Sequence, residues 1–452
     1  MRLLVLLAIC AGYFMVILDT TVVNVALLAI QAQLGGTVTG LQWIVDGYAL
    51  VFASFLLTAG ALGDRLGNKR VFLAGLVIFT AASALCGLAP ALWALEIARV
   101  VQGVGAALLV PASLALLNHT FADPTQCARA IGIWGAIAGI AAGAGPVIGG
   151  FLVNVLSWRS AFLVNVPVGA CGFLLALRFI PPTPRLPQRG FDLGAQVAGI
   201  VALGVLTLAI IEGNSWGWSS LPILGAAAIF VLAAATFIVI ERRAANPMLP
   251  PGLFSVPTFS AANTVGLLLN FGFYGQLFFI SLFFQQIRGY SPLMTGIALL
   301  PETGMALIAS FLSGRVTGRV GPRLPMVIGL ALGCAGFLLM TVVDSATNYA
   351  FICVTLVAIG FGTAFTMPAM TTAVIASAPK ARSGIAAAVL NASRQTGGVL
   401  GVALLGSLVS RHISFVPGMH SALMIAGGAF LIGCLLSLLA IQHGSKPAEA
   451  LT

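Results

Sequence analysis

Long apolar runs, separated by short polar segments, repeat along the whole chain of 452 residues. Each run holds roughly 20 residues, enough for a helix to cross the hydrocarbon core of a bilayer. The pattern therefore predicts an all-α polytopic membrane protein with fourteen spans. The predicted spans lie at roughly 3–28, 42–63, 70–89, 92–118, 129–156, 161–180, 193–212, 221–241, 258–286, 293–316, 325–343, 348–376, 383–410 and 421–441.

Basic residues are divided unevenly between the loops on the two sides of these spans. Sixteen Lys and Arg residues fall on one side, and only Arg159, Arg288 and Arg411 fall on the other. Because cytoplasmic loops carry the excess of Lys and Arg, we expect both termini in the cytoplasm. The net charge of +10 is scattered over short loops, so it does not indicate a nucleic-acid partner.

Composition excludes several classes of protein. The chain is 60% hydrophobic and 7% charged, whereas a soluble domain is about a quarter charged. Its seven cysteines show no metal-site or redox-pair spacing, and its four histidines fall at span ends or in loops. A P-loop is absent from the sequence. We expect no metal site, no cofactor and no enzymatic activity.

Two segments of the first half have a similar copy in the second half, and each copy lies about 255 positions later in the sequence. The charged turn at 60–70 has a weaker copy at 314–323, and the segment 103–112 resembles 360–369. Copies in the same orientation indicate two six-helix bundles related by a parallel repeat. The predicted spans at about 193–241 have no counterpart, and a Pro-rich linker at 181–189 precedes them. The predicted domains are an N-terminal bundle at 1–181, a linker with two inserted helices at 182–257, and a C-terminal bundle at 258–452.

Five motifs in order resemble the major facilitator superfamily, and within it the fourteen-span drug:proton antiporters. The motifs lie at 18–26, 60–70, 99–105, 139–150 and 158–167. The resemblance covers nearly the whole chain. It implies a monomeric transporter of the bacterial inner membrane that exports lipophilic, cationic compounds in exchange for protons by alternating access. The proton gradient would supply the energy, and the need for a periplasmic adaptor stays open.

The charged turn combines bases with one acid and several glycines. The usual excess of Lys and Arg in cytoplasmic loops explains the bases of this turn, but it explains neither the acid nor the glycines. Within the resemblance, Asp64 acts as a conformational latch that stabilises the outward-open state, and the equivalent position in the second copy is Gly318. The predicted latch residues are Gly60, Asp64, Arg65, Gly67, Lys69 and Arg70.

Asp19 and Arg99 are charged residues that lie inside predicted spans of the first half. Asp19 is in the middle of the first span, where an ionised carboxylate costs about 2.5–3.5 kcal/mol. We expect it to act as a proton or substrate-cation site, although bonds to neighbouring polar groups would also explain it. Arg99, in the fourth span, is implied in proton coupling by the resemblance. Glu96, three residues earlier, is its expected local partner.

Two further acids are candidates for the transport pathway, and one further base lies within a span. Asp46 lies near the outer end of the second span and is expected to line an outer vestibule. Glu302, beside Pro301, is expected to be a second protonation or cation-recognition point. Arg394 is an intramembrane base for which we expect a structural pairing role. For both acids the alternative is a bond to helix backbone freed by a proline or a helix end.

The fifth span is rich in glycine. Glycines four residues apart share one helix face and permit close approach of another helix, while proline removes a backbone donor. Ordinary helix packing explains this pattern, and the resemblance adds a role in antiport. The antiporter-motif residues are Gly139, Gly143, Gly145, Pro146, Gly149 and Gly150.

Two other functions stay open at this point. One is export of a single metabolite or antibiotic, and the other is an integral-membrane enzyme. Aromatic side chains provide candidate apolar and cation–π surface for a drug. These residues are Phe14, Trp43, Tyr48, Phe273, Tyr274 and Phe278.

Overall fold

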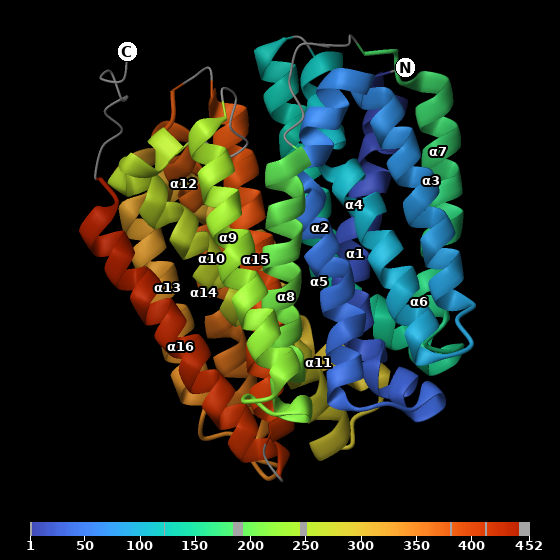
Figure 1. Ribbon diagram of the computed structural model, residues 1–452, viewed down its shortest axis with the longest axis vertical. Helices are drawn as coiled ribbons and strands as arrows, with labels where there is room; N and C mark the ends of the chain where they lie inside the picture. The colour runs from blue at the N-terminus through green and yellow to red at the C-terminus, as the bar shows by residue number, and fades with distance from the viewer. Residues whose placement is uncertain are drawn as a thin grey trace. The chain divides into compact units, whose positions relative to one another are not determined.

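The computed structural model describes residues 2–121, 123–183, 193–244, 251–379, 382–411 and 414–442. Over these residues the chain is helical and contains no strand, as Figure 1 shows. The predicted all-α class is confirmed. Most of the linker predicted at 181–189 lies outside the described residues.

The chain divides into two compact units. The first comprises Met1–Phe191 with Gly289–Leu300, and the second comprises Asp192–Arg288 with Pro301–Thr452. The helices before residue 192 are α1 (Arg2–Leu34), α2 (Val38–Leu66), α3 (Asn68–Gly87), α4 (Leu92–Thr120), α5 (Pro124–Val155), α6 (Ser160–Leu163) and α7 (Asn165–Phe179). The later helices are α8 (Leu193–Trp216), α9 (Leu221–Arg243), the 3-10 turn η1 (Pro251–Ser255), α10 (Pro257–Leu282), the π-helical turn η2 (Phe283–Ile287), α11 (Pro292–Thr303), α12 (Met305–Val320), α13 (Arg323–Met340), α14 (Tyr349–Ala376), α15 (Ser383–Arg411) and α16 (Phe415–Ala440).

Thirteen helical stretches among the described residues are long and apolar enough to cross a membrane, judged by length and composition. The chain is therefore a multi-pass membrane protein. α15 has 29 residues but is less apolar than the other long helices, because its middle is polar. The count of fourteen spans stays a prediction.

The two copies of the charged turn share one backbone feature. Gly67, between α2 and α3, has φ 93°, and Gly321, between α12 and α13, has φ 80°. Side chains other than hydrogen disfavour this left-handed region, so each turn needs its glycine. The two glycines are 254 residues apart, the same offset that relates the two sequence copies.

A base that follows each glycine caps a helix of its own unit. Lys69 Nζ donates to the carbonyl of Leu177 in α7 at 3.0 Å. Arg323 Nη2 donates in the same way to the carbonyl of Leu438 in α16. Carbonyls in the last turns of a helix lack partners within that helix, so cations stabilise them. The internal repeat thus extends from the sequence to the hydrogen bonds.

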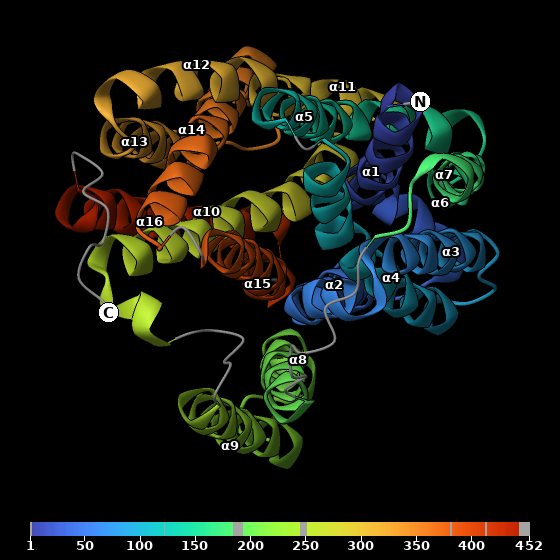
Figure 2. The same cartoon turned by 90° about the horizontal axis from the view of Figure 1, so that it is seen from above.

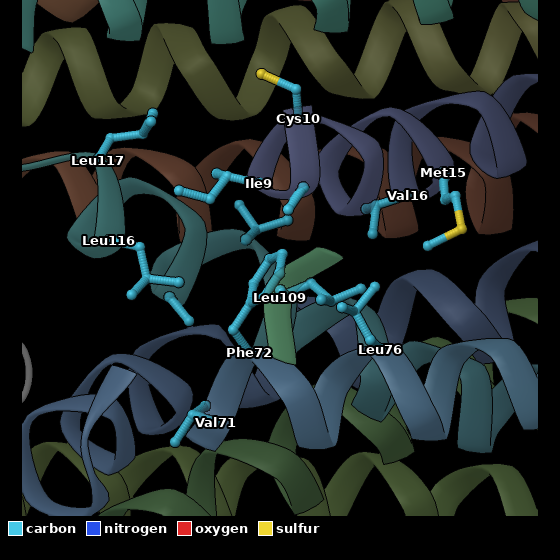
Figure 3. Close-up of a cluster of buried hydrophobic side chains, with 14 of the residues drawn as sticks. Ile9, Cys10, Met15, Val16, Val71, Phe72, Leu76, Leu109, Leu116 and Leu117 are labelled. Carbon is cyan, nitrogen blue, oxygen red and sulfur yellow. The ribbon is translucent and has the colours of Figure 1, made fainter. Parts of the chain in front are cut away.

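Apolar side chains from α1, α3 and α4 form a buried cluster in the first unit (Figure 3). Ile9, Phe72 and Leu109 are fully buried within it. Glycine brings α3 and α4 close together: a Cβ atom on Gly105 would lie 2.6 Å from the backbone nitrogen of Phe79. Such close approach is the usual basis of helix association in membranes.

The inserted helices α8 and α9 pack against each other, as Figures 1 and 2 show. Asn214 Nδ2 on α8 donates to the carbonyl of Ser407 on α15 at 2.8 Å. This hydrogen bond joins α8 to α15 within the second unit.

We predict that Gly105→Ala lowers the thermal unfolding temperature of the purified protein. A methyl group at this position would collide with the backbone of α3. Gly135→Ala on α5 is the control, because a Cβ atom there meets nothing within 4 Å. Alanine favours a helix over glycine by about 0.5–1 kcal/mol, so the control should be neutral or stabilising. Equal effects of the two substitutions would contradict the α3–α4 packing.

Candidate functional site

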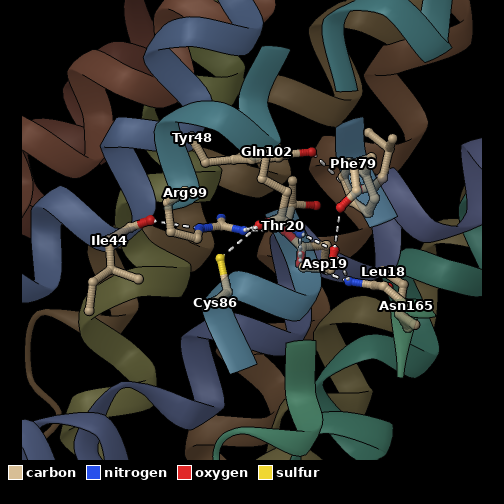
Figure 4. A network of polar contacts seen from close by, with 12 residues as sticks. Leu18, Asp19, Thr20, Ile44, Tyr48, Phe79, Cys86, Arg99, Gln102 and Asn165 are labelled. Carbon is tan, nitrogen blue, oxygen red and sulfur yellow. Dashed lines mark hydrogen bonds and ion pairs between the residues drawn. The ribbon is translucent and has the colours of Figure 1, made fainter. Parts of the chain in front are cut away.

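A buried ion pair joins α1 to α4 in the first unit. Arg99 Nη1 donates to Asp19 Oδ2, and each residue is 1% exposed. Figure 4 shows the two side chains at the centre of a polar network. Because the pair is neutral as a whole, it avoids most of the cost of a lone charge within the membrane. Asp19 and Arg99, which the sequence places in two different spans, therefore lie together.

Neighbouring amides satisfy the rest of the pair. Asp19 Oδ1 accepts hydrogen bonds from Gln102 Nε2 at 2.9 Å and from Asn165 Nδ2 at 3.1 Å. Arg99 Nε donates to the carbonyl of Ile44 at 2.9 Å, and Arg99 Nη1 donates to Gln102 Oε1 at 2.7 Å. Buried polar groups that are fully hydrogen-bonded hold their geometry. This network connects α1, α2, α4 and α7.

Two expectations about Arg99 and its surroundings are wrong. Glu96 is not its partner, because the carboxylate that pairs with Arg99 is that of Asp19. Tyr48 does not offer a surface to a drug, since it is 1% exposed and its ring lies against the guanidinium, 4.2 Å from ring centre to Cζ. A desolvated cation–π contact stabilises the arginine further. Phe278 is also fully buried.

The glycine face of α5 packs against α1 next to Asp19. A Cβ atom on Gly145 would lie 1.9 Å from Thr21 Oγ1, and one on Gly149 would lie 3.0 Å from Val22. α5 continues as one helix through Pro146. The close helix approach expected from this motif is therefore present. The role of the motif in exchange stays a prediction.

Asp46 is enclosed within the first unit and does not line an open vestibule. It is fully buried, and neither of its carboxylate oxygens has a hydrogen-bond partner among the described residues. α2 begins at Val38, so Asp46 lies about two turns inside the helix. The expected position in an outer vestibule is therefore wrong. Asp46 is instead a carboxyl group that contacts neither solvent nor a hydrogen-bond partner among the described residues.

Glu302 is a buried acid of the second unit, as is Glu241 near the end of α9. Glu302 is 1% exposed, its Oε2 accepts a hydrogen bond from Gln276 Nε2 at 3.2 Å, and its Oε1 has no partner among the described residues. Its helix is interrupted directly afterwards, since α11 ends at Thr303 and α12 begins at Met305. Interrupted helices in transporters often line binding sites.

The internal repeat relates Glu302 to Tyr48. A Cβ atom on Gly103 would lie 2.6 Å from the Tyr48 carbonyl oxygen, and one on Gly360 would lie 2.1 Å from the Glu302 carbonyl oxygen. Residue 356, which corresponds to Arg99 in the repeat, is a buried leucine. The second unit therefore has no arginine at the position equivalent to Arg99, so Glu302 is not neutralised in the way that Asp19 is.

Arg394 is half-buried on α15, and its expected structural pairing is wrong. Its Nη2 lies 3.5 Å from Met367 Sδ, and its Nε is buried without a partner. The described residues provide no carboxylate for it.

The residues of the charged turn lie where α2 ends and α3 begins. Asp64 is half-buried in the last turn of α2, while Arg65 and Arg70 are exposed. A Cβ atom on Gly60 would lie 4.0 Å from Pro111 on α4. Lys69 is occupied within its own unit, so the bases of this motif have different roles.

Sequence reasoning missed the role of Asn165. The signal was present, because Asn165 is in the motif at 158–167, but nothing in the sequence places its amide beside Asp19. Ser83 was missed too; its Oγ accepts from Gln102 Nε2 at 2.9 Å. A lone serine within an apolar helix carries no distinctive pattern.

Repeated helical bundles with buried charges define a secondary membrane transporter. Comparison with known proteins agrees, since a family model, the Major Facilitator Superfamily, matches residues 9–402 and 268–451. The chain belongs to the Major Facilitator Superfamily. It is accordingly a transporter and not an enzyme.

Solved structures show the same fold. A POT family transporter in complex with a thioalcohol-conjugated peptide has a TM-score of 0.72 and 14% identity, covering 96% of this chain and 95% of that one. A bacterial homologue of the human lysosomal transporter Spinster has a TM-score of 0.66 and 18% identity, covering 99% and 98%.

Several proteins of similar sequence are resistance proteins. The methylenomycin A resistance protein of Streptomyces coelicolor is 39% identical, covering 95% of this chain and 90% of that protein. The multidrug resistance protein Stp of Mycobacterium tuberculosis is 38% identical, with coverage of 91% and 77%. The tetracenomycin C resistance and export protein of Streptomyces glaucescens is 37% identical, with coverage of 91% and 76%.

We predict that Asp19→Asn and Arg99→Gln each destabilise the protein by about 3–5 kcal/mol, because each leaves a buried charge without its partner. The double variant should lose less than the sum of the two, since it leaves no lone charge. Thermal unfolding of the purified variants measures this. Additive losses would contradict a direct ion pair.

Proposed function

We propose that the chain exports lipophilic compounds in exchange for protons by alternating access. The observation that carries the proposal is Glu302, a buried acid beside an interrupted helix with no cation partner among the described residues. An acid in this setting can hold either a proton or a cationic group, but not both. The resistance and export names of the relatives support the outward direction.

In the proposed cycle, Glu302 exchanges one ligand for the other. A lipophilic cation binds from the cytoplasmic side to the ionised carboxylate. A proton from outside then neutralises the carboxylate, which weakens the attraction for the cation and releases it. Asp46 is a second candidate proton carrier, because its carboxyl group is enclosed without a partner.

Asp19 and Arg99 take a different part in the proposal. Their mutual neutralisation and several hydrogen bonds suit a fixed support better than a site that empties in each cycle. Proton coupling by Arg99 would act through this network. The glycine face of α5, which lies against α1 near Asp19, would be the surface that transmits movement.

The pH gradient drives exchange of one proton for one monovalent cation, because this exchange moves no net charge. When Asp46 carries a second proton, one elementary charge also crosses the membrane in each cycle, and over 100 mV it is worth about 2.3 kcal/mol. We further propose that the protein acts as a monomer in the bacterial inner membrane, with both termini in the cytoplasm and no cofactor. The arrangement as two six-helix bundles with two inserted helices, fourteen spans in all, belongs to the same proposal.

The test of the proposal is export of ethidium by everted membrane vesicles. The wild type should accumulate ethidium only when a proton gradient is present. Glu302→Gln should abolish most of the gradient-driven rate, because the amide cannot take up and release a proton in this range of pH. Glu302→Asp is the matched control, because it retains the acid and should retain part of the rate. Undiminished transport by Glu302→Gln would contradict the role of this acid.

The proposed latch has its own comparison within the internal repeat. Asp64→Asn should impair transport strongly, whereas Gly318→Ala at the equivalent position should not. A Cβ atom on Gly318 meets nothing within 4 Å, so the control is sterically mild. Equal loss of ethidium export in both variants would contradict a latch that depends on one carboxylate.

A narrower substrate range is the second candidate. Two of the relatives above are named for resistance to a single compound, methylenomycin A or tetracenomycin C. A growth-inhibition panel of chemically diverse drugs in a pump-deficient host separates the candidates. Protection against one compound class favours the narrow exporter, and protection against several favours the multidrug exporter.

A further inference from the structure

A polar segment interrupts the middle of α15. Residues 391–396 read Asn-Ala-Ser-Arg-Gln-Thr, and all six are partly exposed. Arg394 lies eleven residues after the first residue of α15, about 16 Å along the helix axis. Polar residues at such a depth usually face the protein interior or a water-filled path. The segment is therefore suited to meet a ligand rather than lipid.

The guanidinium of Arg394 has unused hydrogen-bond donors. Arginine carries five N–H donors. The polar contact of this guanidinium is with a thioether, Met367 Sδ, at 3.5 Å. Its Nε is shielded from solvent and has no partner among the described residues. Thioether sulfur is a weak acceptor, so this contact does not satisfy a cation.

Apolar groups lie beside the stem of Arg394. A Cβ atom on Gly266 of α10 would lie 3.2 Å from Arg394 Cγ and 3.2 Å from Met370 Sδ, so the glycine makes room for the arginine stem. Tyr274, also on α10, is an electrostatic neighbour of the guanidinium. In such surroundings a charge-assisted hydrogen bond is stronger than in water.

Arg99 shows what a structural arginine in this protein looks like. It has a carboxylate, a carbonyl, an amide oxygen and an aromatic ring around it. Arg394 has none of the oxygen acceptors among the described residues. An arginine with a structural role would be expected to have oxygen acceptors like those of Arg99. Because Arg394 lacks them among the described residues, its partner is expected to come from outside the chain.

We propose that Arg394 recognises the carboxylate of a lipophilic ligand, bound where α10, α14 and α15 meet. The planar guanidinium fits a carboxylate through two parallel hydrogen bonds. The inference rests on the proposed function only in taking this ligand to be a transport substrate. It widens the substrate class from lipophilic cations to compounds that carry an acidic group.

Binding of 1-pyrenebutyrate and its methyl ester, which differ in the carboxylate, tests the proposal. The purified full-length protein in phosphatidylcholine nanodiscs is titrated with each compound, and energy transfer from tryptophan to pyrene reports binding. The wild type should bind the acid about tenfold more tightly than the ester, a factor within reach of one charge-assisted pair. Equal binding of acid and ester by the wild type would overturn the proposal.

Variants test whether Arg394 causes the preference for the acid over the ester. Arg394→Gln should abolish it, while Arg394→Lys should keep part of it, because lysine retains the charge but not the bidentate geometry. Arg178→Gln, at an exposed arginine in the last turn of α7, is the matched control and should keep all of it. Retention of the preference by Arg394→Gln would contradict the proposed site.

Nanodiscs that contain phosphatidylglycerol distinguish a substrate carboxylate from a lipid phosphate. Unchanged binding of the acid supports the substrate, and strong competition by the lipid would reassign Arg394 to a headgroup. The thermal unfolding temperature of Arg394→Gln should stay close to that of the wild type, because the contact that the variant loses is a weak one to a thioether. If ethidium export and the thermal unfolding temperature both fall, Arg394 is structural and the proposal fails. If the wild type exports no ethidium but prefers the acid, the proposed function fails and the carboxylate site stands.

Discussion

The ion pair between Asp19 and Arg99 holds the first half of the protein together. A charge alone within a bilayer costs about 2.5–3.5 kcal/mol, so two opposite charges on different helices fix those helices side by side. The carbonyl of Ile44 and the amide of Asn165 extend the pair to two further helices. α5 packs closely beside it through Gly145. The pair and its hydrogen bonds thus join four helices of this half, in addition to the apolar cluster and the glycine contacts.

The second half repeats the helices but not the neutralisation. The buried acid Glu302 accepts a hydrogen bond from a single amide, and Arg394 contacts a thioether instead of a carboxylate. A fully satisfied pair can persist through a transport cycle, whereas an unsatisfied charge gains from a proton or a ligand. We therefore propose that the Asp19–Arg99 pair is a fixed support in the first half, whereas Glu302 and Arg394 bind exchangeable ligands in the second half.

The sequence predicted the membrane class and most helices, because bilayer thickness imposes a length and composition that can be counted. It also identified Asp19 and Arg99 as unusual. It could not show that they touch, since residues 80 positions apart meet only through packing. Glu96 was the wrong partner for Arg99, because helical spacing considers only neighbours on one helix. The burial of Asp46 could not be predicted either, since it depends on which helices pack around α2.

The central claim is that substrate and proton exchange at Glu302. Its most direct test is the internal pH of proteoliposomes that contain the purified protein and no ATP, followed while ethidium is added on one side. The account predicts a substrate-driven movement of protons in the wild type and none in Glu302→Gln. Equal proton movement in both, or ethidium transport by the wild type without any change in pH, would contradict it.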